Sequence, residues 1–545
     1  MASDRALPIQ KIVRNLRPTM IRKYDTLILI LVLFFSALAT AFAGETIGNN
    51  RHVVLIVWDG MRPDFVSEER TPVLWKLASD GVLFRRHHAV YPSMTEVNGV
   101  ALATGVYPSR NGMIANHEYR PAINGKKSVD TEVPRVVKAG DVASHGKYLG
   151  VPTIAELVRK AGRQSIVAGA KGVALLFDRH LGADSKGNSV ALFAGNTFPQ
   201  NALELLVKTL GPFAPAGGVT AIQRDNWTVK AFTDVLWKSG LPDFSLLWLG
   251  QPDLTEHEFA PGSKETLLAI RSADENLGRV LAALDQQNAR QTTDLFVVSD
   301  HGFSTIERSI DLRKILKDAA FDAVTEFVNE PKAGQIMMVG NGGTVLFYVI
   351  NHDTNTIRRL VEFLQRSDFA SVIFTQEPVV GTFKFEEARI DSDHAPDVEM
   401  AFRWTNSKNQ FGVPGMIDAD WNRAAGKGTH ATLSRFDMHA TLITAGPDFR
   451  RGESDDLPTG NIDLAPTILQ VLGIRASQPL DGRILSEAMR SDDLRAPKSE
   501  TLSIEQERKF SDGTWRQSLQ ITRIGSTVYF DEGNGAFIRT KTALP

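Results

Sequence analysis

The chain has 545 residues, of which 43% are hydrophobic, and it contains no cysteine. A chain of this length can bury a large core, and this core must be stable without disulfide bonds. The formal net charge of −2 gives no indication of a nucleic-acid-binding surface, so any ligand is expected at a defined site rather than along a basic groove. The composition does not indicate the oligomeric state.

The first 43 residues are predicted to be a signal peptide. Basic residues occur from Arg5 to Lys23, an apolar run follows at 27–39, and the small residues Ala41 and Ala43 fit a cleavage site. Export is therefore expected, to the periplasm or the outside of a bacterial cell. The alternative is an uncleaved membrane anchor, because the uncharged residues 26–44 are long enough to span a bilayer.

Three hydrophobic runs that end in an aspartate are predicted to be buried strands. They are VVLIVWDG (53–60), FSLLWLGQPD (244–253) and LFVVSDHG (295–302). Such runs are typical of a mostly parallel sheet covered on both faces, in which ligands bind beyond the carboxyl ends of the strands. Asp59, Asp253 and Asp300 are therefore expected at one rim of the sheet.

This rim is predicted to bind metal ions. Three carboxylates held close together repel one another, so a positive charge is needed between them. His257, four residues after Asp253, and His301, next to Asp300, add neutral nitrogen ligands that zinc and related metals accept. Asp59-Gly60 alone would more often be an ordinary turn, but three such ends in one chain favour a metal site.

Predicted helices alternate with the predicted strands. Amphipathic stretches at 151–162, 272–287 and 462–473 indicate an α/β fold, with a doubly wound, mostly parallel sheet flanked by helices. A further strand, helix and strand are expected at 344–350, 354–367 and 371–376. They indicate an inserted α+β cap, which is well placed to cover the site and shape substrate choice.

These patterns divide the chain into five segments. After the signal peptide 1–43, we expect the first part of the core at 44–325, the cap at 326–425, the second part of the core at 426–490, and a tail at 491–545. Residues 518–533 of the tail are strand-like and predict a β-hairpin.

The segment YPSMTEVNGVALATGVYPSRNGMIAN (91–116) carries a more specific pattern. It contains a YP-x-x-T-x-x-N stretch, a TG-x-YP stretch, and an asparagine twenty-one positions after the threonine. In this pattern the chain resembles the alkaline phosphatase superfamily, specifically its nucleotide pyrophosphatase/phosphodiesterase branch, in which the threonine is a nucleophile at a helix start. The matching residues are Thr95, Asn98, Thr104-Gly105, Tyr107-Pro108 and Asn116.

Three further segments resemble the metal-ligand segments of the same branch. They are QPDLTEHEFAPGS (251–263), SDHGF (299–303) and GTHATLSRFDMHATLITAGPDF (428–449). Taken residue by residue, the resemblance implies two divalent metal ions, with zinc as the default metal. The implied ligands of one ion are Asp59, Asp300, His301 and the Thr95 oxygen, and those of the other are Asp253, His257 and His430.

The implied activity is hydrolysis of a small-molecule phosphoester, of the phosphodiesterase or nucleotide pyrophosphatase type, through a phosphothreonine intermediate. A threonine hydroxyl is a poor nucleophile at neutral pH, and metal coordination would activate it without a separate base. A helix start at Thr95 would favour the phosphoryl group under attack. Asn116 would donate its amide to a phosphoryl oxygen.

Residues 165–180 bear on the choice of substrate. The stretch lacks the WPG sequence of eukaryotic-type members, so nucleotide specificity is not implied. Monoesterase relatives place a lysine and an arginine two positions apart here. Lys171 matches the lysine as a substrate-binding residue, whereas Val173 stands where the arginine would be. A monoester dianion needs more positive charge than a diester, so diesters or pyrophosphates are favoured unless Arg179 supplies that charge.

Other functions use the same residues. A phosphomonoesterase or a phosphoryl transferase would keep the whole metal site, and a noncatalytic binding protein is a third alternative. A sulfatase of this superfamily is excluded, because it would need a cysteine at the nucleophile position and the chain has none.

Overall fold

The computed structural model describes residues 51–179, 189–490 and 497–540. All of them belong to one structural unit, residues 50–545. The predicted signal peptide, residues 1–43, lies outside the described residues. Within the described ranges, no helix combines the length and the hydrophobicity that crossing a membrane requires.

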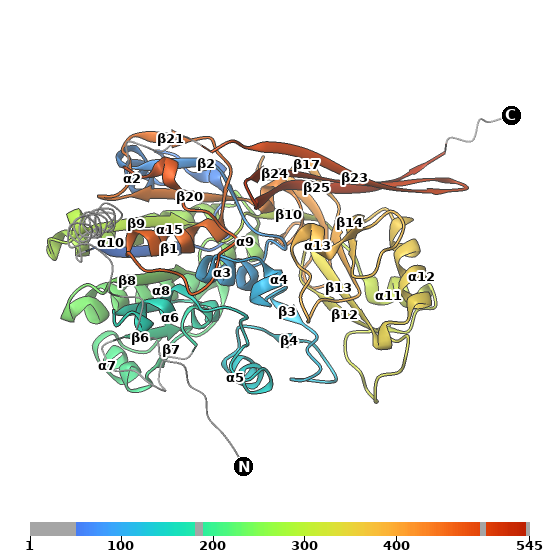
Figure 1. The fold of residues 1–545 in the computed structure, drawn as a ribbon, viewed down its shortest axis with the longest axis horizontal. Helices are drawn as coiled ribbons and strands as arrows, with labels where there is room; N and C mark the ends of the chain where they lie inside the picture. Colours follow the sequence, from blue (N-terminus) through green and yellow to red (C-terminus); the bar gives the residue numbers. More distant parts are fainter. Residues whose placement is uncertain (1–50, 180–188, 491–496, 541–545) are drawn as a thin grey trace, which may run out of the picture. The chain divides into compact units, whose positions relative to one another are not determined.

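A ten-stranded sheet forms the centre of this unit (Figure 1). In spatial order its strands are β21 (Glu453–Asp455), β2 (Val82–His88), β20 (His439–Ala445), β9 (Thr293–Val298), β1 (His52–Trp58), β8 (Phe244–Leu249), β5 (Ser165–Gly169), β6 (Val190–Phe193) and β7 (Asn196–Phe198), and β22 (Thr459–Gly460) also pairs with β2. The inner strands β9, β1, β8, β5 and β6 are parallel, whereas β20 is antiparallel to both β9 and β2. The predicted mostly parallel sheet is confirmed.

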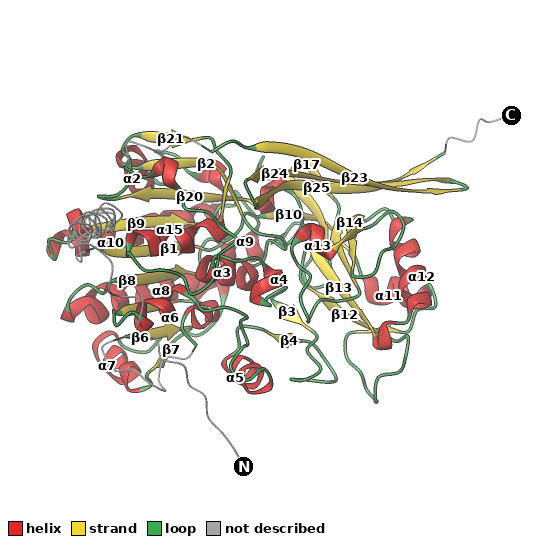
Figure 2. Cartoon of the chain, viewed as in Figure 1, coloured by secondary structure: helices red, strands yellow, loops and turns green. Residues whose placement is uncertain are grey.

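Helices pack against both faces of this sheet, and Figure 2 draws them in red beside the yellow strands. The α-helices are α2 (Pro72–Asp80), α3 (Thr95–Thr104), α4 (Pro108–Asn111), α5 (Pro134–Ala143), α6 (Ile154–Lys160), α7 (Asn201–Leu210), α8 (Gly218–Lys230), α9 (Asp253–Phe259), α10 (Lys264–Gln286), α11 (Leu312–Asp318), α12 (Thr354–Gln365), α13 (Phe385–Ala388), α14 (Arg435–Met438) and α15 (Leu464–Val471). Val53, Leu55 and Val57 of β1 pack in one core with α3, α6 and α15. Val54 and Ile56, on the opposite face, pack in a second core with α2, α8 and α10. Every residue of β1 after His52 is buried, which is why the strand reads as an unbroken hydrophobic run.

A second, six-stranded sheet lies in the chain between β9 and the final histidine segment. Its strands, in order, are β11 (Ala323–Val324), β12 (Ile336–Gly340), β13 (Thr344–Val349), β16 (Val398–Phe402), β14 (Ala370–Thr375) and β15 (Phe383–Lys384). The expected strand, helix and strand at 344–376 correspond to β13, α12 and β14. Ile357, Leu360 and Leu364 of α12 pack with this sheet in a core of their own.

Three smaller sheets complete the described part of the fold. β17 (Trp404–Lys408), β18 (Pro414–Ala419), β10 (Ser304–Ser309) and β19 (Gly428–Thr429) form a four-stranded sheet, so the proposed cap segment 326–425 shares strands with two sheets. β3 (His117–Glu118) pairs with β4 (Val129–Asp130). In the tail, β23 (Glu500–Phe510), β24 (Gly513–Ile524) and β25 (Thr527–Arg539) form a long antiparallel sheet.

Candidate active site

Three buried aspartates lie at one rim of the central sheet. β1 is hydrogen-bonded to β9 on one side and to β8 on the other, and all three strands are parallel. Asp59 follows β1, Asp300 follows β9, and Asp253 begins α9 just after β8. The backbone N–H of Asp253 donates to the carbonyl oxygen of Asp59 at 3.0 Å. The carboxyl ends of three neighbouring strands thus bring together residues far apart in the chain.

One group at this rim consists of Asp59, Asp300, His301 and Thr95. Nε2 of His301 lies 3.6 Å from Oδ1 of Asp59, 3.2 Å from Oδ2 of Asp300 and 3.2 Å from Oγ1 of Thr95. All four side chains are buried. The structure therefore brings together the complete set that the sequence assigns to the first metal ion.

A second group consists of Asp253, His257 and His430. Oδ1 of Asp253 lies 3.2 Å from Nε2 of His257 and 3.5 Å from Nε2 of His430. His257 lies one turn after Asp253 on α9, and His430 follows β19. The rings of His430 and His301 stack with their centres 3.7 Å apart, so the two groups are direct neighbours.

The three histidines share one tautomer. Each Nδ1 lies 2.7 to 3.0 Å from a backbone carbonyl oxygen, that of Ser93 for His430, Gly302 for His301 and Gly428 for His257. Because a carbonyl oxygen only accepts, each Nδ1 carries the hydrogen, and in the neutral ring Nε2 keeps its lone pair. A backbone partner on the far nitrogen is the usual support for a metal-binding histidine.

Three carboxylate oxygens facing these Nε2 atoms are buried and accept no hydrogen bond from any described residue. They are Oδ1 of Asp59, Oδ1 of Asp253 and Oδ2 of Asp300. Buried polar atoms normally have partners, and a lone pair facing a carboxylate oxygen is unfavourable. A cation bound between the nitrogen and oxygen atoms would satisfy both. Neighbouring ligands of a tetrahedral zinc ion lie about 3.3 Å apart, so the two groups fit divalent metal ions.

The negative charge of the aspartates at the rim also favours bound cations. Burial raises the pKa of Asp300 to about 7. Burial and the adjacent Asp300 carboxylate raise the pKa of Asp59 well above its usual value. The protein alone therefore does not keep all of these carboxylates ionised at neutral pH, whereas bound divalent ions would.

Thr95 is the first residue of α3. The residue before it, Met94, makes no side-chain cap, and the backbone N–H of the next residue, Glu96, donates to Oδ1 of Asn116 at 3.1 Å. This bond fixes Asn116 beside the start of the helix, and its amide nitrogen makes no hydrogen bond to the described residues. The helix start, a hydroxyl and an amide donor are thus close together, an arrangement suited to holding a phosphoryl group.

Lys171 reaches between the two groups. It lies at the start of the 3₁₀-helix η2 (Gly172–Phe177), after β5, and its Nζ is 2.9 Å from Oδ2 of Asp59, 3.0 Å from Oδ2 of Asp253 and 3.4 Å from Oγ1 of Thr95. Burial alone would lower the pKa of Lys171, but the carboxylates of Asp253 and Asp59 raise it well above its usual value. Lys171 is therefore a charged residue next to the proposed nucleophile.

The two other residues considered for substrate charge lie elsewhere. Val173 is fully buried, and its Cγ2 would be 2.6 Å from a Cβ added at Gly99 of α3, so it packs against that helix. Arg179 pairs with Glu156 at 3.0 Å and with Asp141 at 3.4 Å. The alternative in which Arg179 reaches the site is wrong, because these two carboxylates hold its guanidinium.

Several residues at the site carry no recognisable sequence signal. Nε1 of Trp248 donates to Oδ2 of Asp59 at 2.8 Å, yet in the sequence Trp248 is one more apolar residue of a buried strand. Nδ2 of Asn461 donates to the carbonyl oxygen of Asp300 at 2.6 Å and to Oδ1 of Asn98 at 2.9 Å. Only the fold brings Asn461 to residues that precede it by 161 and 363 positions.

An acidic group next to Lys171 was also not foreseen. Glu96, Asp130 and Glu132 place carboxylate oxygens within 4.8 Å of one another. Burial and the charge of Glu132 raise the pKa of Glu96 well above its usual value, while Lys171 lowers it. Lys171 thus lies between two sets of carboxylates, which explains why it stays protonated in a buried position.

Comparison with known proteins gives consistent matches over most of the chain. The sequence model described as type I phosphodiesterase / nucleotide pyrophosphatase matches residues 53–369. A venom phosphodiesterase of Macrovipera lebetinus is 24% identical over 434 residues, which are 78% of this chain and 43% of the venom protein. The bis(5'-adenosyl)-triphosphatase enpp4 of Xenopus laevis is 22% identical over 447 residues, 79% of this chain and 80% of that protein.

A solved structure has a similar fold. The murine ectonucleotide pyrophosphatase / phosphodiesterase 5 matches 81% of this chain and 100% of its own, with a TM-score of 0.57 and 17% sequence identity. The chain spans less than half the length of the venom phosphodiesterases that it matches.

Proposed function

The chain belongs to the type I phosphodiesterase / nucleotide pyrophosphatase family, and from this premise we propose that it is a metal-dependent phosphoester hydrolase with Thr95 as the nucleophile. The observation that carries the proposal is the position of the Thr95 hydroxyl. It lies 3.2 Å from Nε2 of His301 and 3.4 Å from Nζ of Lys171, at the start of a helix and beside two groups of metal-type ligands. An ordinary helix-capping threonine would not need these neighbours.

The groups proposed to hold the two ions are Asp59, Asp300, His301 and Thr95 on one side, and Asp253, His257 and His430 on the other. Zinc suits mixed aspartate and histidine ligands, although manganese, iron or cobalt would also be accepted. When bound, two such ions would lower the pKa of the attacking hydroxyl and offset the charge that develops on the leaving oxygen.

The residues of the chain account for the remaining requirements of phosphoryl transfer. Thr95 loses its hydroxyl proton and attacks phosphorus, and its oxygen forms the new ester bond. The bond from phosphorus to the leaving alcohol or phosphate breaks, and the leaving oxygen takes up a proton from solvent. Water then cleaves the phosphothreonine and restores the hydroxyl. Asn116 donates its amide to a phosphoryl oxygen, and the N–H groups at the start of α3 favour the same negative charge.

Lys171 supports a diester or pyrophosphate as the substrate. Of the three residues considered for substrate charge, it alone lies at the site, since Val173 packs in the core and Arg179 is paired elsewhere. A single ammonium group suits the one negative charge of a diester better than the two of a monoester. The names of the relatives, venom phosphodiesterases and a bis(5'-adenosyl)-triphosphatase, point the same way.

Two further parts of the proposal rest on the sequence and the relatives. Residues 1–43 are proposed to direct export, which agrees with relatives described as venom proteins and ectoenzymes. The cap segment 326–425 is proposed to shape substrate choice. A phosphomonoesterase or phosphoryl transferase acting at the same residues is the second candidate function, since it would use Thr95 and both ligand groups unchanged.

The test is a substrate comparison with the purified protein. Hydrolysis of bis-p-nitrophenyl phosphate, p-nitrophenyl phosphate and a nucleotide p-nitrophenyl ester is measured at equal metal concentration. We expect kcat/KM for the diesters to exceed that for the monoester. A large preference for the monoester would favour the second candidate, and no turnover of any of the three would contradict the proposal.

A further inference from the structure

Two histidines and an aspartate meet where the tail joins the central sheet. His88 is the last residue of β2 and His439 the first residue of β20, and they face each other as a pair in the antiparallel ladder. Asp531 comes from β25 of the tail. None of the three belongs to the candidate active site.

The ligand atoms of these residues lie close together. Nε2 of His88 is 3.0 Å and Nε2 of His439 is 3.9 Å from Oδ1 of Asp531, and all three atoms lie within 4.8 Å of one another. The two rings meet edge to face with centres 5.1 Å apart. In the two groups at the active site, the corresponding nitrogen-to-carboxylate distances are 3.2 to 3.6 Å.

The hydrogen bond of Nδ1 of His88 fixes which nitrogen of the neutral ring would face Asp531. Nδ1 of His88 lies 2.9 Å from the carbonyl oxygen of Thr459, which only accepts, so Nδ1 carries the hydrogen. In the neutral ring, Nε2 then presents a lone pair to Oδ1 of Asp531, and two acceptors face each other at 3.0 Å. His88 is 1% exposed, so water cannot readily relieve this contact.

The second histidine has an unpaired nitrogen aimed at the same oxygen. Nε2 of His439 is buried and makes no hydrogen bond within the described part of the chain. The side chain as a whole is 36% exposed, so the group is within reach of an ion from solvent. A cation between Nε2 of His88, Nε2 of His439 and Oδ1 of Asp531 would satisfy all three atoms.

We propose that His88, His439 and Asp531 form a third metal site, separate from the active site, that binds a zinc-type divalent ion. Two imidazole nitrogens and one carboxylate oxygen are ligands that zinc, cobalt and nickel accept, and water can complete the coordination at the exposed edge. Calcium and magnesium, which prefer oxygen ligands, are not expected.

The site would fasten the tail to the core. Asp531 is 443 residues away from His88 in the chain, and the chain has no cysteine to form a disulfide cross-link. A metal ion that binds residues of β2, β20 and β25 stabilises the folded state over the unfolded one, in which the ligands are far apart.

Two other partners of Asp531 are compatible with this site. Oγ1 of Thr522 donates to Oδ2 at 2.8 Å, which leaves Oδ1 for the ion. Nη2 of Arg86 donates to Oδ1 at 3.4 Å, a long hydrogen bond from a side chain that is 37% exposed, so Oδ1 keeps a lone pair for the ion. The competing arrangement is a metal-free cluster in which a protonated His88 and Arg86 pair with Asp531.

Native mass spectrometry of the full chain after loading with Zn²⁺ tests the proposal. We expect three ions per chain for the wild type and two for His439→Asn and for Asp531→Asn. Arg86→Ala is the matched control at the same cluster and should keep three ions. Zn²⁺ should also raise the Tm of His439→Asn less than that of the wild type, with equal Tm values in chelator as evidence that the variant folds.

The ion counts show whether a failure concerns the third metal site or the two-metal active site of the proposed function. Equal ion counts in the wild type and His439→Asn would overturn the third site and support the metal-free cluster. His430→Ala removes a ligand of the active site only, so the double variant His430→Ala/His439→Asn should bind one ion. If the wild type bound a single ion and only His439→Asn lost it, the result would support this site and contradict the two-metal active site.

Discussion

Both ends of strand β9 hold a buried aspartate, but their surroundings differ. At the carboxyl end, Asp300 faces His301, and one of its oxygens has no hydrogen-bond partner among the described residues. At the amino end, Oδ1 of Asp294 accepts the backbone N–H of Asp448 at 3.0 Å, and Oδ2 of Asp294 also has no partner among the described residues, but no histidine nitrogen faces it. Asp448 in turn forms a two-point ion pair with Arg51, at 2.8 and 2.9 Å.

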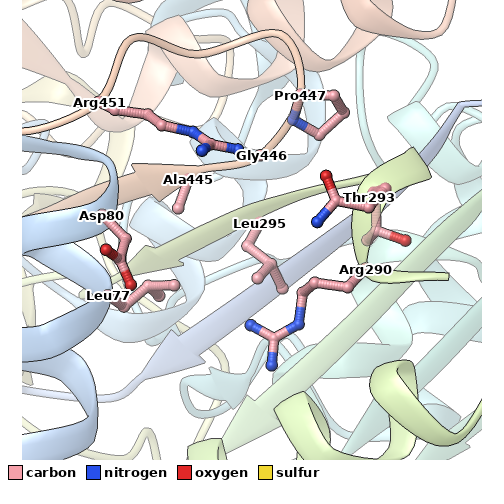
Figure 3. Close-up of a pocket in the computed structure, with 10 residues that line it drawn as sticks. Leu77, Asp80, Arg290, Thr293, Leu295, Ala445, Gly446, Pro447 and Arg451 are labelled. Atoms are coloured by element: carbon pink, nitrogen blue, oxygen red, sulfur yellow. The ribbon is translucent and has the colours of Figure 1, made fainter. Parts of the chain in front are cut away.

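Two further arginines line a cavity at the amino end, and one of them, Arg290, is itself paired with Asp285 at 3.0 Å. Figure 3 shows Arg290, Arg451 and Asp80 around a cavity at this end, with Thr293 at the start of β9. The cavity has a volume of about 280 Å³. Guanidinium groups are permanently charged and match carboxylates well. The Asp448 carboxylate at the amino end is therefore balanced by Arg51, one of the protein's own cations.

The carboxyl end lacks such a balance. Three aspartates share one lysine, and the neighbouring histidine nitrogens present lone pairs rather than protons. A buried carboxylate alone therefore does not indicate a metal site. The distinguishing feature is a group of carboxylates that faces the lone pairs of several histidine nitrogens, because a bound metal ion satisfies both kinds of atom.

The largest expected effect comes from removing the nucleophile at the carboxyl end. Thr95→Ala should reduce kcat by at least about 10³-fold, because no other hydroxyl takes the place of Oγ1. The variant should keep its fold and most of its metal. Thr95→Ser should retain part of the activity, since it keeps the hydroxyl. Wild-type turnover by the alanine variant would rule out a covalent phosphothreonine.

Removing metal should abolish activity and leave the contacts at the amino end of β9 intact. After exhaustive chelation we expect hydrolysis to stop and to return when Zn²⁺ is added. His430→Ala should bind one ion fewer than the wild type by mass spectrometry, while His394→Ala, at an exposed histidine outside the ligand groups, should bind the full number. A chelated protein with full activity would disprove metal dependence.

The sequence predicts the fold of this rim well, for a physical reason. Strands buried on both faces must be hydrophobic throughout, so β1, β8 and β9 stand out as runs at 53–60, 244–253 and 295–302. The α/β fold and the family inferred from the motifs are both confirmed. The order of strands in the second sheet could not be predicted from the sequence, because β13 pairs with β16 rather than with β14, the next strand along the chain.

The residues of the two proposed ligand groups could be picked out because each lies next to a strand end or within a recognisable motif. Their supporting partners were not. Trp248 and Asn461 contact Asp59 and Asp300 through single hydrogen bonds that leave no pattern in the sequence. Val173 occupies the position expected for an arginine, but only the packing against Gly99 shows that a side chain there faces the core.

Lys171 provides a test of how the carboxyl end balances charge. Lys171→Gln should lower kcat/KM for diesters by about tenfold and for monoesters by more, because the dianion loses the same partner but has more charge to offset. Lys138→Gln removes an exposed lysine and serves as the charge-matched control. If Lys171→Gln left both substrates unaffected, Lys171 would not bind substrate, and its contacts with Asp59 and Asp253 would be structural.

The smallest expected effect concerns the amino end and its dependence on pH. Burial and the nearby Asp448 raise the pKa of Asp294 to about 8 in the folded state, against 3.8 as its ordinary value. Between these two values the folded protein retains a proton that the unfolded chain has released, so the free energy of unfolding falls as pH rises. One such group changes it by at most about 1.4 kcal/mol per pH unit.

Asp294→Asn should therefore flatten the pH dependence of stability without affecting hydrolysis. The amide keeps the oxygen that accepts the Asp448 N–H and cannot ionise, so urea denaturation should show the variant gaining on the wild type between pH 5 and pH 8, by on the order of 1 kcal/mol per pH unit. Asp80→Asn, at an exposed carboxylate beside the same cavity, is the control and should leave the profile unaltered. If Asp294→Asn instead lost the same stability at pH 5 and at pH 8, Asp294 would not retain a proton in the folded state. Arg51 would then neutralise the charged Asp294 carboxylate, and the two ends of β9 would differ even more in how they compensate charge.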